Sequence, residues 1–293
     1  MFNIVKNRKI FYIISAIVII AGIASMFIQG FEMDIDFAGG IECTVNVNKA
    51  VDSNVSNEIV KIVKDSTGAK ASVVKAGEKE ALIKISEELS AEKQVAMKDA
   101  IKAKYGVEEN AFTSFEVVSP TVGKEMQTSA LLAVVIAVAL MLIYISIRFE
   151  FLSGCAAVVA LIHDVLIMLS FYSIFKIAIN TTFIAAILTI LGYSINATIV
   201  LFDRVRENQR ITRKESFANI VNTSVWQTML RSLNTSFTTL ATIIVLFFVG
   251  VDSIKEFALP ITVGVVAGFY SSVFLSGNFW IFFKKLAKQK NVQ

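Results

Sequence analysis

The sequence predicts a bundle of six transmembrane α-helices (an α-helical membrane fold) with a small α+β domain inserted after the first helix. Three observations support this fold class. Hydrophobic residues make up 55% of the 293 residues and charged residues only 18%, whereas a soluble domain carries about a quarter charged residues. The apolar residues form long uncharged runs, as in membrane proteins. Residues 30–126, in contrast, are polar and show the alternating patterns of a small folded domain.

The first apolar run, Ile10–Gln29, follows the basic residues Lys6, Arg8 and Lys9 and superficially resembles a signal peptide. A signal peptide has an apolar core of about 7–15 residues. Because this run is longer, we expect a retained transmembrane helix. Five further runs have the roughly 20 apolar residues that a spanning helix needs. They are Thr128–Ile147, Gly154–Phe175, Thr181–Leu201, Leu230–Gly250 and Phe257–Phe283.

The polar segment between the first two runs alternates between strand and helix patterns. Four stretches predict strands: Ile41–Val47, Ala71–Lys75, Ala81–Ile85 and Phe112–Val118. Helical spacing predicts one helix over Asp52–Asp65 and another over Ala91–Tyr105, which begins after Ser90 and ends at Gly106. The resulting order β-α-β-β-α-β is the ferredoxin-like pattern.

Basic residues flank the apolar runs on one side and predict the orientation. They are Arg148, then Arg204, Arg206, Arg210, Arg213 and Lys214, and finally Lys284, Lys285, Lys288 and Lys290. Because basic loops stay in the cytoplasm, both termini are expected there. The predicted parts are a tail with the first helix (1–29), an extracytoplasmic domain (30–126), helices two to six (127–283) and a basic cytoplasmic tail (284–293).

One amphipathic stretch between the fourth and fifth runs has two interpretations. Phe217, Ile220, Val221 and Val225 share one helical face, with Trp226 nearby. The stretch is either an interfacial helix lying on the membrane or an extension of the fifth transmembrane helix.

Composition excludes several classes of function. His163 is the only histidine, so no multi-histidine metal site is possible, and the two cysteines, Cys43 and Cys155, give no disulfide framework. No nucleotide-binding loop, catalytic triad or acid–base pair can be assembled. We therefore expect no enzyme, no cofactor, no metal and no nucleic-acid partner, and any work must be driven by an ion gradient or a partner ATPase.

Ionisable and amide groups inside the apolar runs are the candidate site, because such groups are costly in a bilayer. His163 and Asp164 lie near the middle of the third run and either relay a proton or hydrogen-bond between helices; as neighbours they should point about 100° apart. Asn196 either joins helices or contributes to transport. Arg231 either extends to the cytoplasmic interface or lies deeper among the hydroxyls of a polar helix.

Six motifs resemble the SecD/SecF family of protein-export membrane proteins, a branch of the RND superfamily. They are MDIDFAGG (Met33–Gly40), VSPTVGKE (Val118–Glu125), RFE (Arg148–Glu150), ALIHDV (Ala160–Val165), GYSINATIVLFDRVREN (Gly192–Asn208) and LRSLNTSFTT (Leu230–Thr239). Their order and spacing cover nearly the whole chain. The single modest external domain is similar to the SecF type, since SecD-type members have a much larger external region.

The resemblance implies an RND-type half-transporter in the bacterial plasma membrane. It would pair with SecD, work with the SecYEG channel and the SecA ATPase, and use the ion-motive force to move unfolded preprotein. Two other functions are compatible with the sequence alone: a small RND-type exporter of lipids or hydrophobic molecules, or a scaffold that only stabilises SecD.

The resemblance also implies roles for particular residues. Arg231 matches the functional arginine of the family, and the cytoplasmic motif (Asp203, Arg204, Arg206) and the turn motif (Asp36, Gly39, Gly40) match structural positions. Two positions depart from the pattern: Ser119 stands where glycine is usual, and Ala197 stands where many members have an aspartate implicated in proton passage. The second departure matters for ion coupling, since alanine cannot titrate. SecD could carry the ion alone, Asp164 could substitute, or Asn196 with its neighbours could bind another ion such as sodium.

Overall fold

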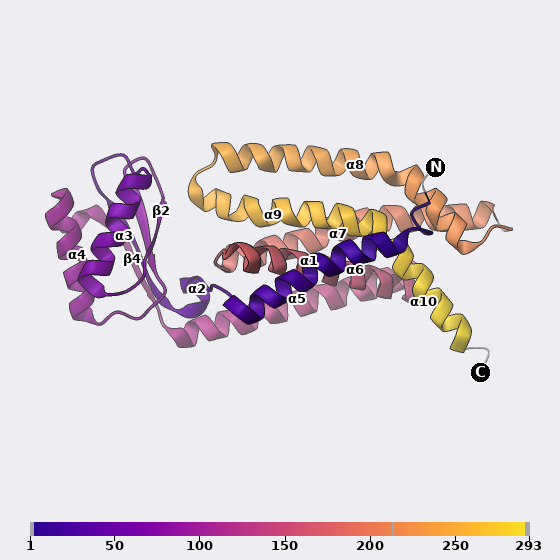
Figure 1. Cartoon of the computed structure of the whole chain (residues 1–293), viewed down its shortest axis with the longest axis horizontal. Coiled ribbons are helices and arrows are strands. Elements are labelled where there is room, and N and C mark those ends of the chain that lie inside the picture. The colour runs from indigo at the N-terminus through magenta and orange to yellow at the C-terminus, as the bar shows by residue number, and fades with distance from the viewer. Residues whose placement is uncertain (1–2, 213, 291–293) are drawn as a thin grey trace.

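The computed structural model describes residues 3–212 and 214–290, and six of its helical segments are long and apolar enough to cross a membrane. Five are single helices: α1 (Arg8–Gln29), α5 (Pro120–Arg148), α6 (Phe151–Phe175), α7 (Thr181–Ile211) and α8 (Phe217–Val249). The sixth combines α9 (Asp252–Tyr270), the π-helix η2 (Ser271–Ser276) and α10 (Gly277–Lys290). Figure 1 shows these helices side by side, with a sheet-containing domain at one end and both chain ends at the other. The predicted orientation charge Arg213 and the last three residues of the predicted tail lie outside the described residues.

Several helices extend past the predicted apolar runs. The second spanning helix, α5, begins at Pro120 rather than at the predicted Thr128. Its start is fixed because the Ser119 hydroxyl accepts a hydrogen bond from the Val122 amide and proline suits the first helical position. The predicted boundary between residues 126 and 127 therefore lies inside α5. The fourth spanning helix continues for ten residues beyond its predicted end, Leu201, and ends at Ile211. The sixth spanning helix contains a π-helical segment.

The amphipathic stretch that starts at Phe217 is continuous with the fifth spanning helix. α8 runs without interruption from Phe217 to Val249. Ser216 caps its first turn by accepting a hydrogen bond from the Asn219 amide. The structure thus confirms the helix-extension interpretation and excludes a separate interfacial helix.

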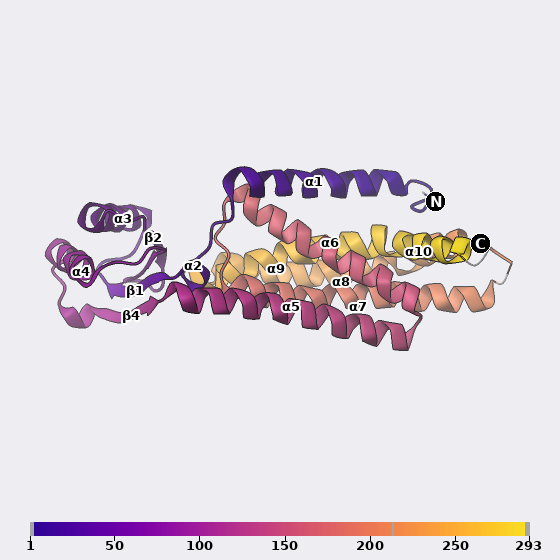
Figure 2. The same cartoon turned by 90° about the horizontal axis from the view of Figure 1, so that it is seen from below.

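The sheet domain, residues 40–118, has the predicted order of strands and helices. Its elements are β1 (Gly40–Asn46), α3 (Ser53–Thr67), β2 (Ser72–Lys75), β3 (Glu80–Ile85), α4 (Ala91–Tyr105), η1 (Glu109–Ala111) and β4 (Phe112–Val118). The strands are antiparallel in the order β2-β3-β1-β4. Figure 2 shows α3 and α4 on one face of the sheet. Between the two layers lies a separate apolar core that includes Val45, Ile59, Ile83, Met97 and Ile101.

A short link fixes the sheet domain to the helices. It contains α2 (Ile35–Ala38), which packs on α5, where the Gln127 side chain donates a hydrogen bond to the Phe37 carbonyl at 2.8 Å. Gly39 and Gly40 follow with φ angles of 79° and 147°. A Cβ on Gly40 would lie 2.0 Å from the Ile85 carbonyl oxygen, so the turn into β1 requires glycine.

Candidate functional site

The first candidate site is a group of polar side chains buried among the helices. Asp164 on α6 is fully buried, and its Oδ2 accepts hydrogen bonds from Ser194 of α7 at 2.5 Å and from Ser271 of η2 at 2.9 Å. Its Oδ1 lies 3.0 Å from Nδ1 of His163, whose Nε2 lies 3.0 Å from the Ser15 hydroxyl of α1. We call these five residues the buried cluster; it joins α1, α6, α7 and η2.

The prediction that His163 and Asp164 point apart is wrong for their polar atoms. Although neighbours on a helix start about 100° apart, the His163 ring rotates until Nδ1 meets the carboxylate. The reason is their apolar surroundings, in which an unpaired polar atom is costly. The imidazole also stacks on Tyr270, with ring centroids 6.0 Å apart.

The buried cluster can hold a proton. A serine hydroxyl both donates and accepts hydrogen bonds, so Ser194 and Ser271 can reorient around either a charged or a protonated Asp164. The π-helix beginning at Ser271 adds a local irregularity of the type often found at functional sites. Within the described ranges, no group of three or more His, Cys, Asp or Glu residues could hold a metal ion.

The second candidate site is a polar cleft of about 1010 Å³ at the end of the bundle that carries the chain termini. Ten polar residues line this cleft: Arg148, Asn196, Asp203, Arg204, Arg206, Glu207, Arg210, Gln227, Thr228 and Arg231. Within it, Arg204 donates to Gln227 and to Glu207, both at 2.7 Å. The guanidinium of Arg148 forms an ion pair with Asp203 at 3.7 Å, and the backbone carbonyl of Arg148 accepts a hydrogen bond from the Arg206 side chain. The cleft thus joins the cytoplasmic motif to Asn196 and Arg231.

Arg231 opens an exposed polar stripe along α8. The other exposed polar residues of the stripe are Asn234, Thr235, Thr238 and Thr242. Beside it, α7 exposes the small or polar residues Ala185, Thr189, Gly192 and Asn196. Exposed residues on α1 and α5, such as Ile17 and Leu140, are instead large and apolar. α8 also exposes large apolar residues such as Leu233 and Phe237. The polar stripes of α7 and α8, in contrast, suit water or another polar protein surface rather than lipid.

The four predicted ion-path residues consequently fall in two places. His163 and Asp164 belong to the buried cluster, and Asn196 and Arg231 belong to the polar cleft. Of the turn motif, Asp36 accepts hydrogen bonds from the Thr181 amide at 2.9 Å and from the Thr181 hydroxyl at 2.5 Å, which satisfies the first backbone amide of α7. Sequence reasoning missed Ser15, Ser194 and Ser271, because single serines in apolar helices carry no distinguishing pattern.

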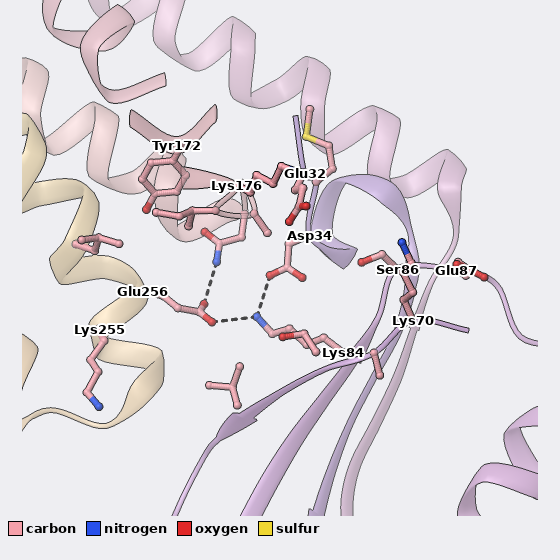
Figure 3. A pocket seen from close by; sticks show the side chains of 18 of the residues that line it. Glu32, Asp34, Lys70, Lys84, Ser86, Glu87, Tyr172, Lys176, Lys255 and Glu256 are labelled. Carbon is pink, nitrogen blue, oxygen red and sulfur yellow. Dashed lines mark hydrogen bonds and ion pairs between the residues drawn. The ribbon is translucent and has the colours of Figure 1, made fainter. Parts of the chain in front are cut away.

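The third candidate site is a cleft of about 680 Å³ between the sheet domain and the helices, here called the junction cleft (Figure 3). Lys84 of β3 extends into it and contacts Asp34 at 2.9 Å and Glu256 of α9 at 3.4 Å. Burial lowers the pKa of Lys84, but its hydrogen bond to Asp34 and the nearby carboxylates outweigh burial and raise the pKa above the usual lysine value. Sequence analysis missed this network, because Lys84 and Glu256 are 172 residues apart.

Comparisons with known proteins agree on one family. The family model described as protein export membrane protein SecD/SecF, C-terminal, matches residues 97–286. The chain is 39% identical to the protein translocase subunit SecF of Acidaminococcus fermentans, over 98% of this chain and 99% of that protein. It is also 39% identical to the protein translocase subunit SecDF of Bacillus subtilis, over 95% of this chain and 38% of that protein.

A solved structure resembles the whole fold. The crystal structure of SecDF from Thermus thermophilus, described as a translocon-associated membrane protein, superposes with a TM-score of 0.82 at 31% sequence identity. The match covers 97% of this chain and 39% of that one. The chain therefore spans about two fifths of the length of these SecDF proteins and nearly all of the SecF relative.

Proposed function

The chain belongs to the SecD/SecF family of protein export membrane proteins, and on that premise we propose that it is an accessory subunit of the Sec protein-export machinery. It acts with SecD to drive or complete preprotein translocation with the ion-motive force. The observation that carries the ion-driven part is Asp164, a fully buried carboxylate held among hydroxyls from neighbouring helices. A group of this kind within membrane-spanning helices is expected to be functional.

The proposed topology follows from the charges at the bundle ends. Arg148, Arg204, Arg206 and Arg210 lie at the end with the termini, which the positive-inside rule assigns to the cytoplasm. The sheet domain is then a ferredoxin-like domain on the outer face of the bacterial plasma membrane. From that side it is suited to meet unfolded preprotein leaving the SecYEG channel, while the SecA ATPase acts on the inside.

SecD is the partner that the polar side of the bundle fits best. The relatives named SecDF are much longer than this chain, which leaves room in each for a SecD part. The exposed stripes of α7 and α8 would otherwise face lipid with hydroxyls, two amides and a guanidinium group. A second helical half placed against them would satisfy these groups and shield the polar cleft.

Asp164 takes the role that Ala197 cannot fill. In this proposal Asp164 binds the coupling ion, most simply a proton. When the carboxyl becomes protonated, one of the two hydroxyls, Ser194 or Ser271, turns from donor into acceptor of its single O–H. His163 fixes the orientation of the carboxylate through Nδ1. The polar cleft, with Asn196 and Arg231 in its wall, supplies the aqueous connection to the cytoplasm.

Translocation in proteoliposomes tests this function. Vesicles would contain the chain, its SecD partner, SecYEG and SecA, and preprotein uptake would be measured without a gradient, with a proton gradient and with a sodium gradient. Stimulation by one gradient supports an ion-driven subunit and identifies the ion. Equal uptake in all three conditions, in a complex shown to be intact, leaves only a scaffolding role.

A further inference from the structure

Lys84 makes a lateral contact between the sheet domain and the transmembrane helices. Its ammonium group lies between Asp34, in the link before α2, and Glu256, near the start of α9 (Figure 3). The other carboxylate oxygen of Glu256 accepts a hydrogen bond at 2.9 Å from Asn180, the cap of α7. Only 11% of the Lys84 side chain and 10% of the Asp34 side chain are exposed.

Burial makes this contact stiff. An exposed ion pair can break and re-form in water at little cost, whereas a buried charge that loses its partner stays poorly solvated and costs several kcal/mol. Lys84 has two carboxylates, one on the link and one on α9. A displacement of α9 therefore either carries Lys84 and its strand with it or breaks the 3.4 Å contact with Glu256 and leaves Lys84 paired with Asp34 alone.

The same helix reaches the buried cluster at its other end. Ser271, which directly follows α9, donates its hydroxyl hydrogen bond to Asp164. Glu256 and Ser271 are about 22 Å apart along the helix, at 1.5 Å per residue. Between them, α9 packs tightly on α7: a Cβ on Gly264 would lie 2.5 Å from Ile190, and one on Gly268 would lie 3.1 Å from Ser194. This packing restrains α9 from Gly264 onward, whereas Pro260 interrupts the backbone hydrogen bonds of the helix between Glu256 and Gly264. A shift at Ser271 therefore reaches Glu256 through the short segment around Pro260.

We propose that Lys84 is a positioning residue that makes the sheet domain follow α9, so that a change at Asp164 becomes a movement of the domain. The proposal rests on the proposed function, since it assigns the output of the same ion site. It also predicts a mechanical relationship between Asp164 and the domain that can be measured without any export assay.

The mechanical test uses spin labels on the full chain, one at Lys93 on α4 and one at Ile28 at the end of α1. Both positions are exposed, Cys155 is replaced by Ala, and the remaining Cys43 is fully buried. The inter-label distance distribution is compared before and after Asp164→Asn, in the parent chain and in Lys84→Met. We expect Asp164→Asn to shift the distribution in the parent and not in Lys84→Met. An equal shift in both, or no shift in the parent, overturns the proposal.

The functional test uses the proteoliposome assay with Lys84→Met, Lys84→Arg and the control Lys70→Met. Lys70 lines the same cleft but is exposed and forms no ion pair with another described residue. We expect Lys84→Met to reduce the gradient-stimulated rate about fivefold or more, the size of a typical coupling between sites. The gradient-free rate should stay unchanged, and Lys84→Arg should restore stimulation, since a guanidinium reaches both carboxylates.

The two tests separate the failure of each idea. A parent complex without gradient stimulation contradicts the proposed function, and the spin-label result then still decides the role of Lys84. If the gradient stimulates the parent complex and the Lys84→Met complex equally, the result contradicts the role of Lys84 and leaves the proposed function intact. Loss of both gradient-free and stimulated uptake in Lys84→Met, with SecD still bound, indicates a structural role and also overturns the inference.

Discussion

Ser194 and Asn196, two residues apart on α7, face opposite sides of that helix. Ser194 is fully buried and donates to Asp164 at 2.5 Å, whereas Asn196 is exposed in the wall of the polar cleft with Arg231. Successive helical residues turn by about 100°, so a spacing of two places them nearly opposite. α7 is thus the wall between the buried cluster and the polar side, and an ion passing from the cleft to Asp164 must cross it.

Replacing Asp164 by Asn is expected to remove the response of translocation to the ion gradient. Asparagine keeps the size of the side chain and can still accept a hydrogen bond from a serine, but it cannot bind and release a proton. The measurement is preprotein uptake in proteoliposomes with and without the gradient. Ser170→Ala on the same helix is the matched control, because the buried Ser170 hydroxyl has no hydrogen-bond partner among the described residues. A folded Asp164→Asn complex with undiminished gradient stimulation would refute the role of Asp164.

Replacing Arg231 by Ala is expected to abolish gradient-stimulated export while SecD remains bound. Arg231 lies where the polar cleft meets the hydroxyl stripe of α8, so its loss removes the positive charge at this junction. The expected decrease is about tenfold or more in the stimulated rate. Arg210→Ala, in the same cleft but on the polar extension of α7, should have a smaller effect. Normal export by Arg231→Ala would show that the residue is only an orientation charge.

Replacing Gly192 by Leu is expected to weaken association with SecD without unfolding the chain. A Cβ at Gly192 meets no atom within 4 Å, and glycine in a helix is less favourable than other residues by about 0.5–1 kcal/mol. The isolated chain should therefore keep or slightly raise its thermal stability, while the amount of SecD that copurifies falls several-fold. Ala139→Leu, an enlargement by three carbons at an exposed position of α5, is the control. Equal copurification of SecD with both variants would show that the partner surface does not include this face of α7.

Replacing Glu42 by Gln is expected to stabilise the sheet domain at neutral pH. Burial raises the pKa of Glu42. The positive charge of Lys84 lowers this pKa in part, and the negative charges of Asp34 and Glu116 raise it further. An acid with a raised folded-state pKa destabilises the fold as pH rises from its unfolded value of about 4.3 through the folded value. The gain in the free energy of unfolding that Gln provides should be absent below about pH 4. Near pH 7 it should be constant, at less than about 1 kcal/mol.

The measurement is thermal unfolding of the full chain in detergent across this pH range, with Glu88→Gln at an exposed position as the control. A stabilisation that does not change with pH would indicate that hydrogen bonding, rather than the charge of Glu42, is responsible.

The spanning helices and the strand order could be predicted because both depend on short-range patterns. Twenty apolar residues identify a helix such as α6, and alternation over Ile41–Val47 identifies β1. Helix ends were less accurate, since hydropathy reports the membrane boundary and not the end of the hydrogen-bonded helix. Caps decided those ends, as at Ser119, and the polar turns of α7 continue to Ile211 outside the apolar run.

The candidate site could be predicted only in its most unusual members. Asp164 and Arg231 were identifiable because a charge in an apolar run is rare, whatever its neighbours are. Their partners depend on packing: Ser15 reaches His163 across 148 residues of sequence, and Glu256 reaches Lys84 across 172. No local pattern contains such pairs, and the π-helix over Ser271–Ser276 has no sequence signal either.

The hydroxyl stripe of α8 also bears on how the cell manages the chain after synthesis. A copy made without its partner exposes Arg231, Asn234 and several threonines to hydrocarbon, where such polar groups are costly. Excess copies should therefore be short-lived, and their half-life should lengthen when SecD is co-expressed. If the proposed pairing with SecD holds, degradation of unpaired copies would set the ratio of the two subunits without matched rates of synthesis.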